Sequence, residues 1–332
     1  RFEVDFWGRL ARLDEAAAAG LLASRLSLDV VETTLASAAA QTYFALRSLD
    51  AQIAVLENSL RARRDSLAIA RARLEAGLAS ELDVYQAQGA LSDALVQQRE
   101  SRRQRALVER QLGQLAGRLD IEIAPGDLFS LPVPPTPPPG LPSALLERRP
   151  DIRSAEQGMV AANALIGVAR AELFPSISLT AALGAQSAEL SSLLSSGAGI
   201  WSLGFALAAP IFDAGRREAR VEQARAVHEQ ALASYQGSIE TAFREVADAL
   251  VSVEAATAAE AQLQTRLHAA RAALELSTLR YESGYSPYLE VLDAQRTAND
   301  AELAFVRNRQ ARLAFSVDLM KALGGGWTPP PP

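Results

Sequence analysis

The residues able to carry out chemistry are few in this sequence. It contains no cysteine, and its only two histidines, His228 and His268, lie far apart. Thiol nucleophiles, thiolate metal sites and paired imidazoles are therefore absent. No Ser/His/Asp set and no glycine-rich phosphate-binding loop is recognisable either. The sequence predicts a protein that is not an enzyme and that needs no cofactor or metal.

One acidic pair has a spacing that bears on function. Glu290 and Asp293 are three residues apart shortly after Gly284, which places both carboxylates on one face of a helix that begins there. Carboxylates at a helix start are also favoured simply because they complement the helix dipole. Whether the pair is functional or merely solvated depends on the elements that position it.

The composition favours a helical protein. Of the 332 residues 49% are hydrophobic but only 6% are aromatic, and alanine is the main apolar residue, which suits closely packed helices. A net charge of −6 offers no electrostatic surface for nucleic acid. No segment approaches the ~20 apolar residues of a transmembrane helix.

The chain is a tandem duplication with an offset of 207 residues. In that register Leu74–Gly77 aligns with Tyr281–Gly284, and Leu82–Val84 aligns with Leu289–Val291. We therefore predict four segments, namely a first repeat that lacks its beginning, a proline-rich linker, a second repeat and a short tail, over residues 1–125, 126–141, 142–325 and 326–332.

Each repeat is expected to hold a long helix, a glycine-containing turn and a helix of about half that length. The expected helices are Leu10–Ala76, Glu81–Ala116, Asp213–Ser283 and Pro287–Leu323. A heptad seam typical of coiled coils runs along the first of them. Its members are Leu46, Leu49, Ile53, Leu56, Leu60, Arg63, Leu67, Ala70 and Leu74.

Two segments in the second repeat alternate with a period of two. They are Ser176–Leu183 and Ser202–Ala208, which we expect to pair as a hairpin over about residues 175–210. Each has roughly the length of a tilted membrane strand, with one apolar face. The opening residues Phe2, Val4 and Phe6 alternate in the same way and predict the end of an equivalent strand. Within the linker, Leu131–Gly140 should run as extended polyproline II along the outside.

Two readings of this pattern remain open. Long helices with a decorative hairpin suit a soluble coiled-coil scaffold. A lone hairpin is marginal in water and cannot expose its edges in lipid, so strands of a membrane barrel completed by oligomerisation are the other reading.

Several motifs resemble the TolC-like outer-membrane efflux family, and within it the OprM/NodT-type lipoprotein branch. They are Glu147–Ile152, Ala161–Ala164, Ile166–Ala171, Phe174–Thr180, Ala242–Leu250, Leu292–Arg296 and Lys321–Trp327. The resemblance implies a mainly α fold with a β-barrel part, in which a homotrimer builds a twelve-stranded barrel and an α-helical tunnel. It also implies a passive conduit in the outer membrane that extends into the periplasm. The implied partners are a periplasmic adaptor protein, an inner-membrane transporter of the resistance-nodulation-division type and outer-membrane lipid.

The resemblance also assigns roles at the periplasmic tip. Glu290 and Asp293 match acidic constriction positions, which a trimer would turn into rings of three carboxylates that select or bind cations. Asp83 matches an acidic partner in the first repeat, and Tyr281 matches a tyrosine that holds the tip closed. An arginine found in the turn of some relatives is replaced here by Ser286, so no salt bridge is carried over to that position.

The beginning of the natural protein is expected to be missing. The sequence opens at Arg1 within an alternating segment and without methionine. By resemblance, the missing part would carry a lipidated cysteine, a first helix and a first strand.

Overall fold

The computed structural model describes residues 2–134, 146–194 and 196–325. The predicted tail, 326–332, and the greater part of the proline run lie outside these residues. The chain forms two compact units. We call Arg1–Val30 with Pro142–Ala242 the strand unit, and Val31–Leu141 with Phe243–Pro332 the hairpin unit.

The helices confirm the duplication. The long helices α1 (Arg9–Glu75) and α5 (Arg216–Glu282) each have 67 residues, and the shorter α2 (Glu81–Leu115) and α6 (Tyr288–Ala322) each have 35. Both ends of each pair differ by the 207-residue offset found in the sequence. At about 1.5 Å per residue each long helix extends roughly 100 Å. The first parts of α1 and α5 belong to the strand unit and the rest to the hairpin unit.

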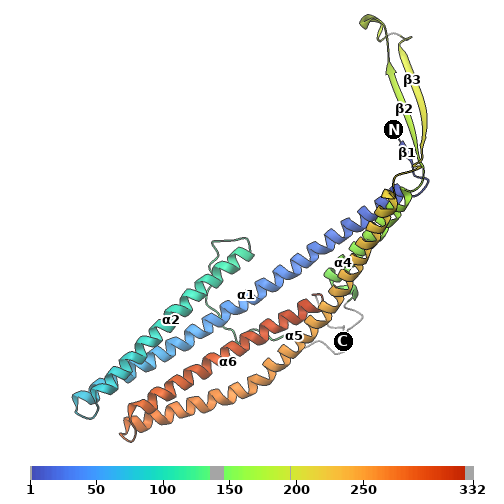
Figure 1. Ribbon diagram of the computed structural model, residues 1–332. Coiled ribbons are helices and arrows are strands. Elements are labelled where there is room, and N and C mark those ends of the chain that lie inside the picture. Colours follow the sequence, from blue (N-terminus) through green and yellow to red (C-terminus); the bar gives the residue numbers. More distant parts are fainter. Residues whose placement is uncertain (1, 135–145, 195, 326–332) are drawn as a thin grey trace, which may run out of the picture. The chain divides into compact units, whose positions relative to one another are not determined.

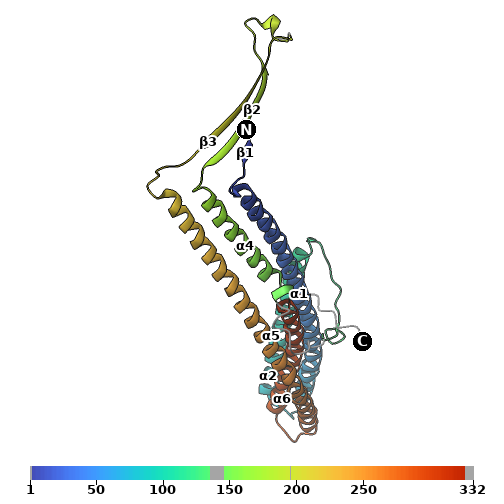
Figure 2. The same ribbon diagram turned by 90° about the vertical axis from the view of Figure 1, so that its right-hand side faces the viewer.

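In the strand unit, three antiparallel strands form one sheet in the order β1-β2-β3. They are β1 (Phe2–Val4), β2 (Ser176–Ala185) and β3 (Gly199–Ala208). β1 ends before Phe6, which lies in the turn into α1. The helix α4 (Pro150–Ala171) precedes β2, and Figure 2 shows α1, α4 and α5 meeting the base of the strands.

The pairing register collects the apolar residues of all three strands on one face. Ile177 pairs with both Val4 and Leu207, and Leu179 pairs with both Phe2 and Phe205. Further along, Ala181 pairs with Leu203 and Leu183 with Trp201. Because directly paired residues point to the same side of a sheet, these side chains share a face. Most of them are exposed: Leu183 is 90% exposed and Trp201 77%.

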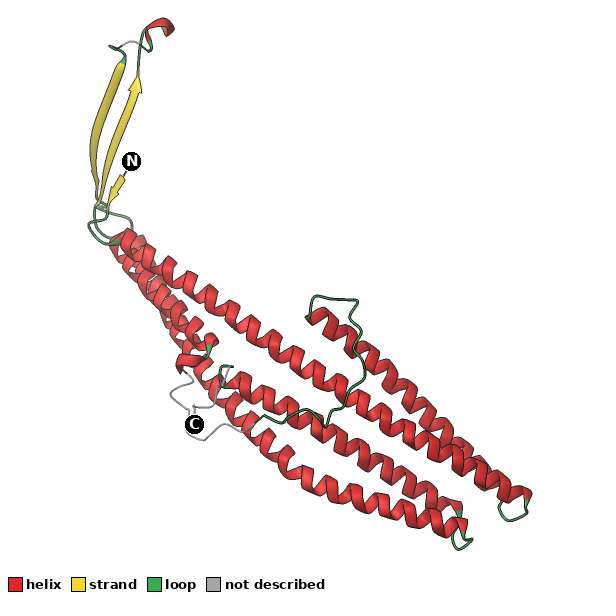
Figure 3. Cartoon of the chain, turned by 180° about the vertical axis from the view of Figure 1, so that it is seen from behind, coloured by secondary structure: helices red, strands yellow, loops and turns green. Residues whose placement is uncertain are grey.

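In the hairpin unit, α1 and α2 form one antiparallel hairpin and α5 and α6 form the other (Figures 1 and 3). The predicted seam is confirmed over most of its length. Leu46, Leu49, Leu56, Leu60, Arg63, Leu67 and Ala70 are all buried, whereas Ile53 and Leu74 are partly exposed. Among the described residues, none of the helices combines the length and apolarity needed to cross a membrane.

The start of the linker, ahead of the stretch predicted as polyproline II, packs against α6. Leu128 is fully buried against Val306 and Leu313 of α6, and the Phe129 ring stacks on Phe305 at 5.4 Å. The apolar side chains that precede the prolines cause this packing, because they bury more favourably against α6 than in water.

Candidate functional site at the hairpin tips

The two helix-to-helix turns are built alike. Gly77 ends α1 with φ +70° and Gly284 ends α5 with φ +83°, a conformation that glycine adopts without strain. The next amide in each turn closes the end of the helix. Leu78 N donates to Arg73 O and Tyr285 N to Arg280 O, both at 2.8 Å. The turns therefore place the first residues of α2 and α6 beside the last turns of α1 and α5.

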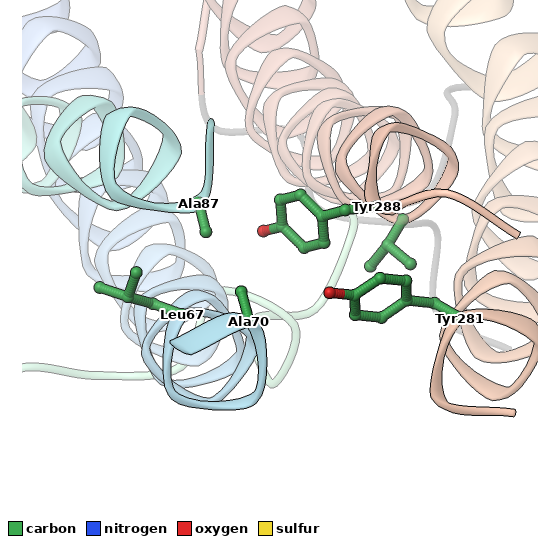
Figure 4. Close-up of a cluster of buried hydrophobic side chains, with 6 residues drawn as sticks. Leu67, Ala70, Ala87, Tyr281 and Tyr288 are labelled. Carbon is green, nitrogen blue, oxygen red and sulfur yellow. The ribbon is translucent and has the colours of Figure 1, made fainter. Parts of the chain in front are cut away.

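An aromatic cluster joins the two hairpins at these tips. Tyr281 of α5 and Tyr288 of α6 pack edge to face, with ring centroids 5.4 Å apart. They contact Leu67 and Ala70 of α1 and Ala87 of α2. Figure 4 shows the Tyr281 hydroxyl directed toward Ala70 and the Tyr288 hydroxyl toward Ala87. Tyr281 is 5% exposed and Tyr288 is fully buried, so the second hairpin inserts two rings against the first.

Arg73, in the last turn of α1, adds polar contacts between the hairpins. Its guanidinium lies over the Tyr281 ring at 4.8 Å. Its Nη1 donates to the backbone oxygen of Tyr281 at 2.7 Å and to that of Glu282 at 3.2 Å. These carbonyls belong to the last turn of α5, where the regular i+4 helical donors are missing; Tyr281 O also accepts from Gly284 N at 3.0 Å. Sequence reasoning missed Arg73, although its equivalence to Arg280 in the repeat could have drawn attention to it.

The predicted residue Tyr281 is thus placed at the contact between hairpins, and Asp83 lies close by. Ser80 Oγ accepts a 3.4 Å hydrogen bond from the Asp83 amide and caps α2. The Asp83 side chain is half-buried. Burial raises the pKa of the Tyr281 phenol, and the negative charge of Asp83 raises it further. Burial likewise raises the pKa of Tyr288. Both phenols are therefore neutral near pH 7.

Glu290 and Asp293 take different partners. Glu290 lies 3.1 Å from Arg280 at the end of α5, and Asp293 lies 2.8 Å from Arg296 on its own helix. The Glu290 and Asp293 side chains are 41% and 65% exposed, so each ion pair is worth about 1 kcal/mol or less. Neither carboxylate is fixed tightly, and both are accessible to solutes.

Asp293 and Arg296 line a hollow of about 500 Å³ between α2 and α6. The opposite wall includes Gln86, which is the repeat equivalent of Asp293, and Asp93. Leu292 also borders this hollow and packs against the aromatic cluster.

Arg63 lies at the back of the same hollow. It is 8% exposed and donates to Ala90 O at 2.8 Å and to Ser59 Oγ at 3.2 Å. Burial lowers its pKa. Within the described residues there is no group of His, Cys, Asp or Glu that could hold a metal ion.

Comparison with known proteins identifies the class of protein to which this fold belongs. A family model for outer membrane efflux proteins matches residues 1–118 and 141–325. The chain belongs to the outer membrane efflux protein family. It is an outer-membrane efflux channel protein and not an enzyme.

Particular relatives support the assignment. Outer membrane protein OprJ of Pseudomonas aeruginosa is 39% identical over 330 residues, which cover 98% of this chain and 68% of OprJ. The toluene efflux pump outer membrane protein TtgF of Pseudomonas putida is 39% identical over 334 residues, with the same two coverages. A solved structure of CusC, from work on its folding and transmembrane channel formation, is 34% identical with a TM-score of 0.92 and covers 98% of this chain and 76% of that one. The soluble scaffold considered from the sequence is therefore not favoured.

Proposed function

We propose that this protein is the passive outer-membrane conduit of a tripartite efflux pump. Three copies would close a twelve-stranded barrel and continue it as an α-helical tunnel. A periplasmic adaptor and an inner-membrane transporter of the resistance-nodulation-division type would load the tunnel and supply the energy. The solutes would be drugs or other small molecules, taken from the periplasm or the transporter and released outside.

The observation that carries this proposal is the sheet. Its apolar residues share one face and are largely exposed, and only three strands are present among the described residues. Such a face is stable in lipid only if every strand edge is paired, so further strands from other copies are needed. The long helices α1 and α5, which follow β1 and β3 in the chain, would give the tunnel its length.

Glu290 and Asp293 are proposed to form an acidic constriction at the far end of the tunnel. In a trimer each would occur three times around the axis, and rings of carboxylates favour cations. Tyr281, together with Asp83, would hold the hairpin tips in the closed arrangement. A lipid anchor on a cysteine ahead of Arg1 is proposed from the family resemblance alone.

Single-channel conductance of the full-length protein in planar bilayers tests the duct and the constriction together. We expect small, cation-preferring currents, which grow and lose their cation preference in Asp293→Asn and, to a smaller extent, in Glu290→Gln. Glu254→Gln is the matched control, because Glu254 is exposed on α5 and lies 28 residues before the end of that helix at Glu282.

The outcomes separate the parts of the proposal. If the wild-type protein conducts and Asp293→Asn behaves identically, the duct stands and the constriction assignment fails. If correctly folded wild-type protein never inserts, the duct itself is rejected.

A further inference from the structure

A second hollow lies in the strand unit, where the strands give way to helices. We call it the boundary hollow. Its volume is about 460 Å³, and its walls come from the bases of the strands, the start of α1, the end of α4 and the start of α5. Seven charged side chains line it: Glu3, Asp5, Arg9, Glu172, Arg216, Arg217 and Arg220. Four arginines thus face three carboxylates.

The carboxylates of the boundary hollow are already engaged. Glu3 accepts two 2.8 Å hydrogen bonds from Arg9. Asp5 accepts from the backbone amides of Leu10 and Ala11 at 2.9 and 2.8 Å and so caps α1. None of these bonds involves α5.

The arginines on α5 are engaged as well, with one exception. Glu172 lies 2.9 Å from Arg220. Arg217 donates to the backbone oxygen of Glu172 at 2.7 Å and lies 3.5 Å from Asp213. The exposed guanidinium of Arg216 makes no hydrogen bond or ion pair with any residue that the structure describes.

The duplication explains why Arg216 is left unpaired. Arg9 and Arg216 are equivalent residues, the first of α1 and α5, and each follows a glycine with φ near +75° (+74° at Gly8, +78° at Gly215). In the first repeat Glu3 neutralises the arginine. The equivalent position in the second repeat is Pro210, which brings no charge. The second repeat therefore has the arginine, Arg216, but no carboxylate at the position equivalent to Glu3.

Large apolar side chains precede this cation in the chain, and others line the same hollow. Ile211 is 98% exposed and Phe212 is 89% exposed, just before Arg216 in the chain. Among the lining residues the Trp7 ring stacks on Phe174 at 4.5 Å, and Trp7 Nε1 donates to Pro175 O at 2.7 Å. Aromatic rings together with arginine at the ends of membrane strands are typical of the boundary between lipid and water.

We propose that the boundary hollow binds the phosphate of an anionic phospholipid in the periplasmic leaflet of the outer membrane. Arg216 supplies the two parallel N–H groups that match phosphate oxygens. Ile211 and Phe212 contact the acyl chains of the same lipid. The lipid is favoured over a free anion because only a lipid can both cover the exposed apolar side chains with its acyl chains and pair its phosphate with the arginine. This inference rests on the proposed position of the strands in the membrane.

The test titrates the full-length protein in detergent with dihexanoyl phosphatidylglycerol, a short-chain anionic lipid, and detects bound lipid by native mass spectrometry. Arg216→Ala should weaken binding roughly tenfold or more, as expected for loss of a charge-assisted hydrogen-bonded pair. Arg225→Ala is the matched control, because Arg225 is also exposed on α5 but is paired with Glu222 at 2.5 Å. It should bind as the wild type does.

A variant with the opposite sign sharpens the test. Glu3→Gln removes the partner of Arg9 and leaves a second free guanidinium in the same hollow, so it should bind the lipid several-fold more tightly. A merely structural role of Arg216 would not produce this gain.

Two results would overturn the proposal. One is an unchanged affinity in Arg216→Ala, and the other is binding of inorganic phosphate as tight as that of the lipid, which would mark a simple anion site. Insertion of the wild-type protein is measured separately by conductance, so failure of the duct and failure of the lipid site are distinguishable.

Discussion

The two hairpin tips have the same backbone conformation, but their equivalent arginines bind different partners. Arg73 and Arg280 are equivalent in the repeat, as are Asp83 and Glu290. In the second hairpin the arginine pairs with its own acid, Arg280 with Glu290 at 3.1 Å. In the first hairpin Arg73 instead reaches across to the carbonyls of Tyr281 and Glu282.

The aromatic residues create this difference. Tyr281 and Tyr288 stand where the first repeat has Leu74 and Glu81. Tyr281 offers Arg73 a ring face and holds the end of α5 within its reach. The two hairpins of the duplication therefore differ, because the arginine of the first contacts the second, whereas the arginine of the second contacts only its own hairpin. The following predictions test how far the difference between the tips depends on each residue.

The largest effect is expected from Tyr288→Ala. Tyr288 is fully buried, and its removal leaves a cavity that costs about 3–5 kcal/mol. The equivalent change in the first repeat, Glu81→Ala, removes an exposed side chain and should cost well under about 1 kcal/mol. Hydrogen exchange of the amides in the second and third turns of α6 and α2, which are hydrogen-bonded within each helix, measures both effects. Equal effects would contradict the asymmetry.

Arg73→Ala should rank second. It removes a charged donor from two backbone carbonyls and a cation over a ring, which together contribute roughly 2–3 kcal/mol. Spin labels at the exposed turn residues Leu78 and Tyr285 should show a broader distance distribution.

Two variants control this experiment. Arg280→Ala should leave the distribution nearly as in the wild type, because its partner lies in the same hairpin. Arg73→Lys should give a distribution of a width between those of the wild type and Arg73→Ala, because an ammonium keeps the charge but lacks the forked geometry. A broader distribution in Arg280→Ala than in Arg73→Ala would contradict the assignment of Arg73 as the arginine that links the two hairpins.

Alkaline pH should loosen the aromatic cluster. The folded protein holds the pKa values of Tyr281 and Tyr288 above the ordinary value of 10.0. The contribution of these two phenols to the free energy of unfolding is therefore complete below pH 10. It decreases as the pH rises from 10 toward the folded pKa, by up to about 1.4 kcal/mol per pH unit for each tyrosine. Thermal unfolding between pH 9 and pH 11 measures this loss.

The double variant Tyr281→Phe/Tyr288→Phe should flatten the alkaline dependence, because phenylalanine keeps the ring and has no proton to lose. Tyr285→Phe, which changes an exposed ring of the turn, should leave the dependence as it is. An unaltered profile in the double variant would show that the alkaline loss arises elsewhere.

The smallest effect on stability is expected from Glu290→Gln. Its pair with Arg280 is half exposed on both sides, so its loss should change the free energy of unfolding by about 0.2–1 kcal/mol, and by less at high salt. Chemical denaturation at low and high ionic strength checks this. A loss as large as that of Arg73→Ala would show that both tips are fastened equally.

Much of this fold was predictable because its signals are local or periodic. The 207-residue offset predicted four helices whose ends all agree with the repeat. Alternation in Ser176–Leu183 and Ser202–Ala208 predicted the hairpin, and its register confirms the shared apolar face. The buried position of Leu128 was not predicted, because the neighbouring prolines indicate an extended chain but not the surface against which it packs.

The sequence by itself determined the elements, their lengths and the acidic pair, because heptad spacing, strand alternation and glycine turns depend on neighbours along one chain. Only the tertiary structure decided which arginine crosses between hairpins and which cation lacks a partner. Arg73 and Arg280, like Arg9 and Arg216, are the same residue type at equivalent positions of the repeat. What separates them is the side chain that another segment brings within about 4 Å, since ion pairs and hydrogen bonds form only at such short range.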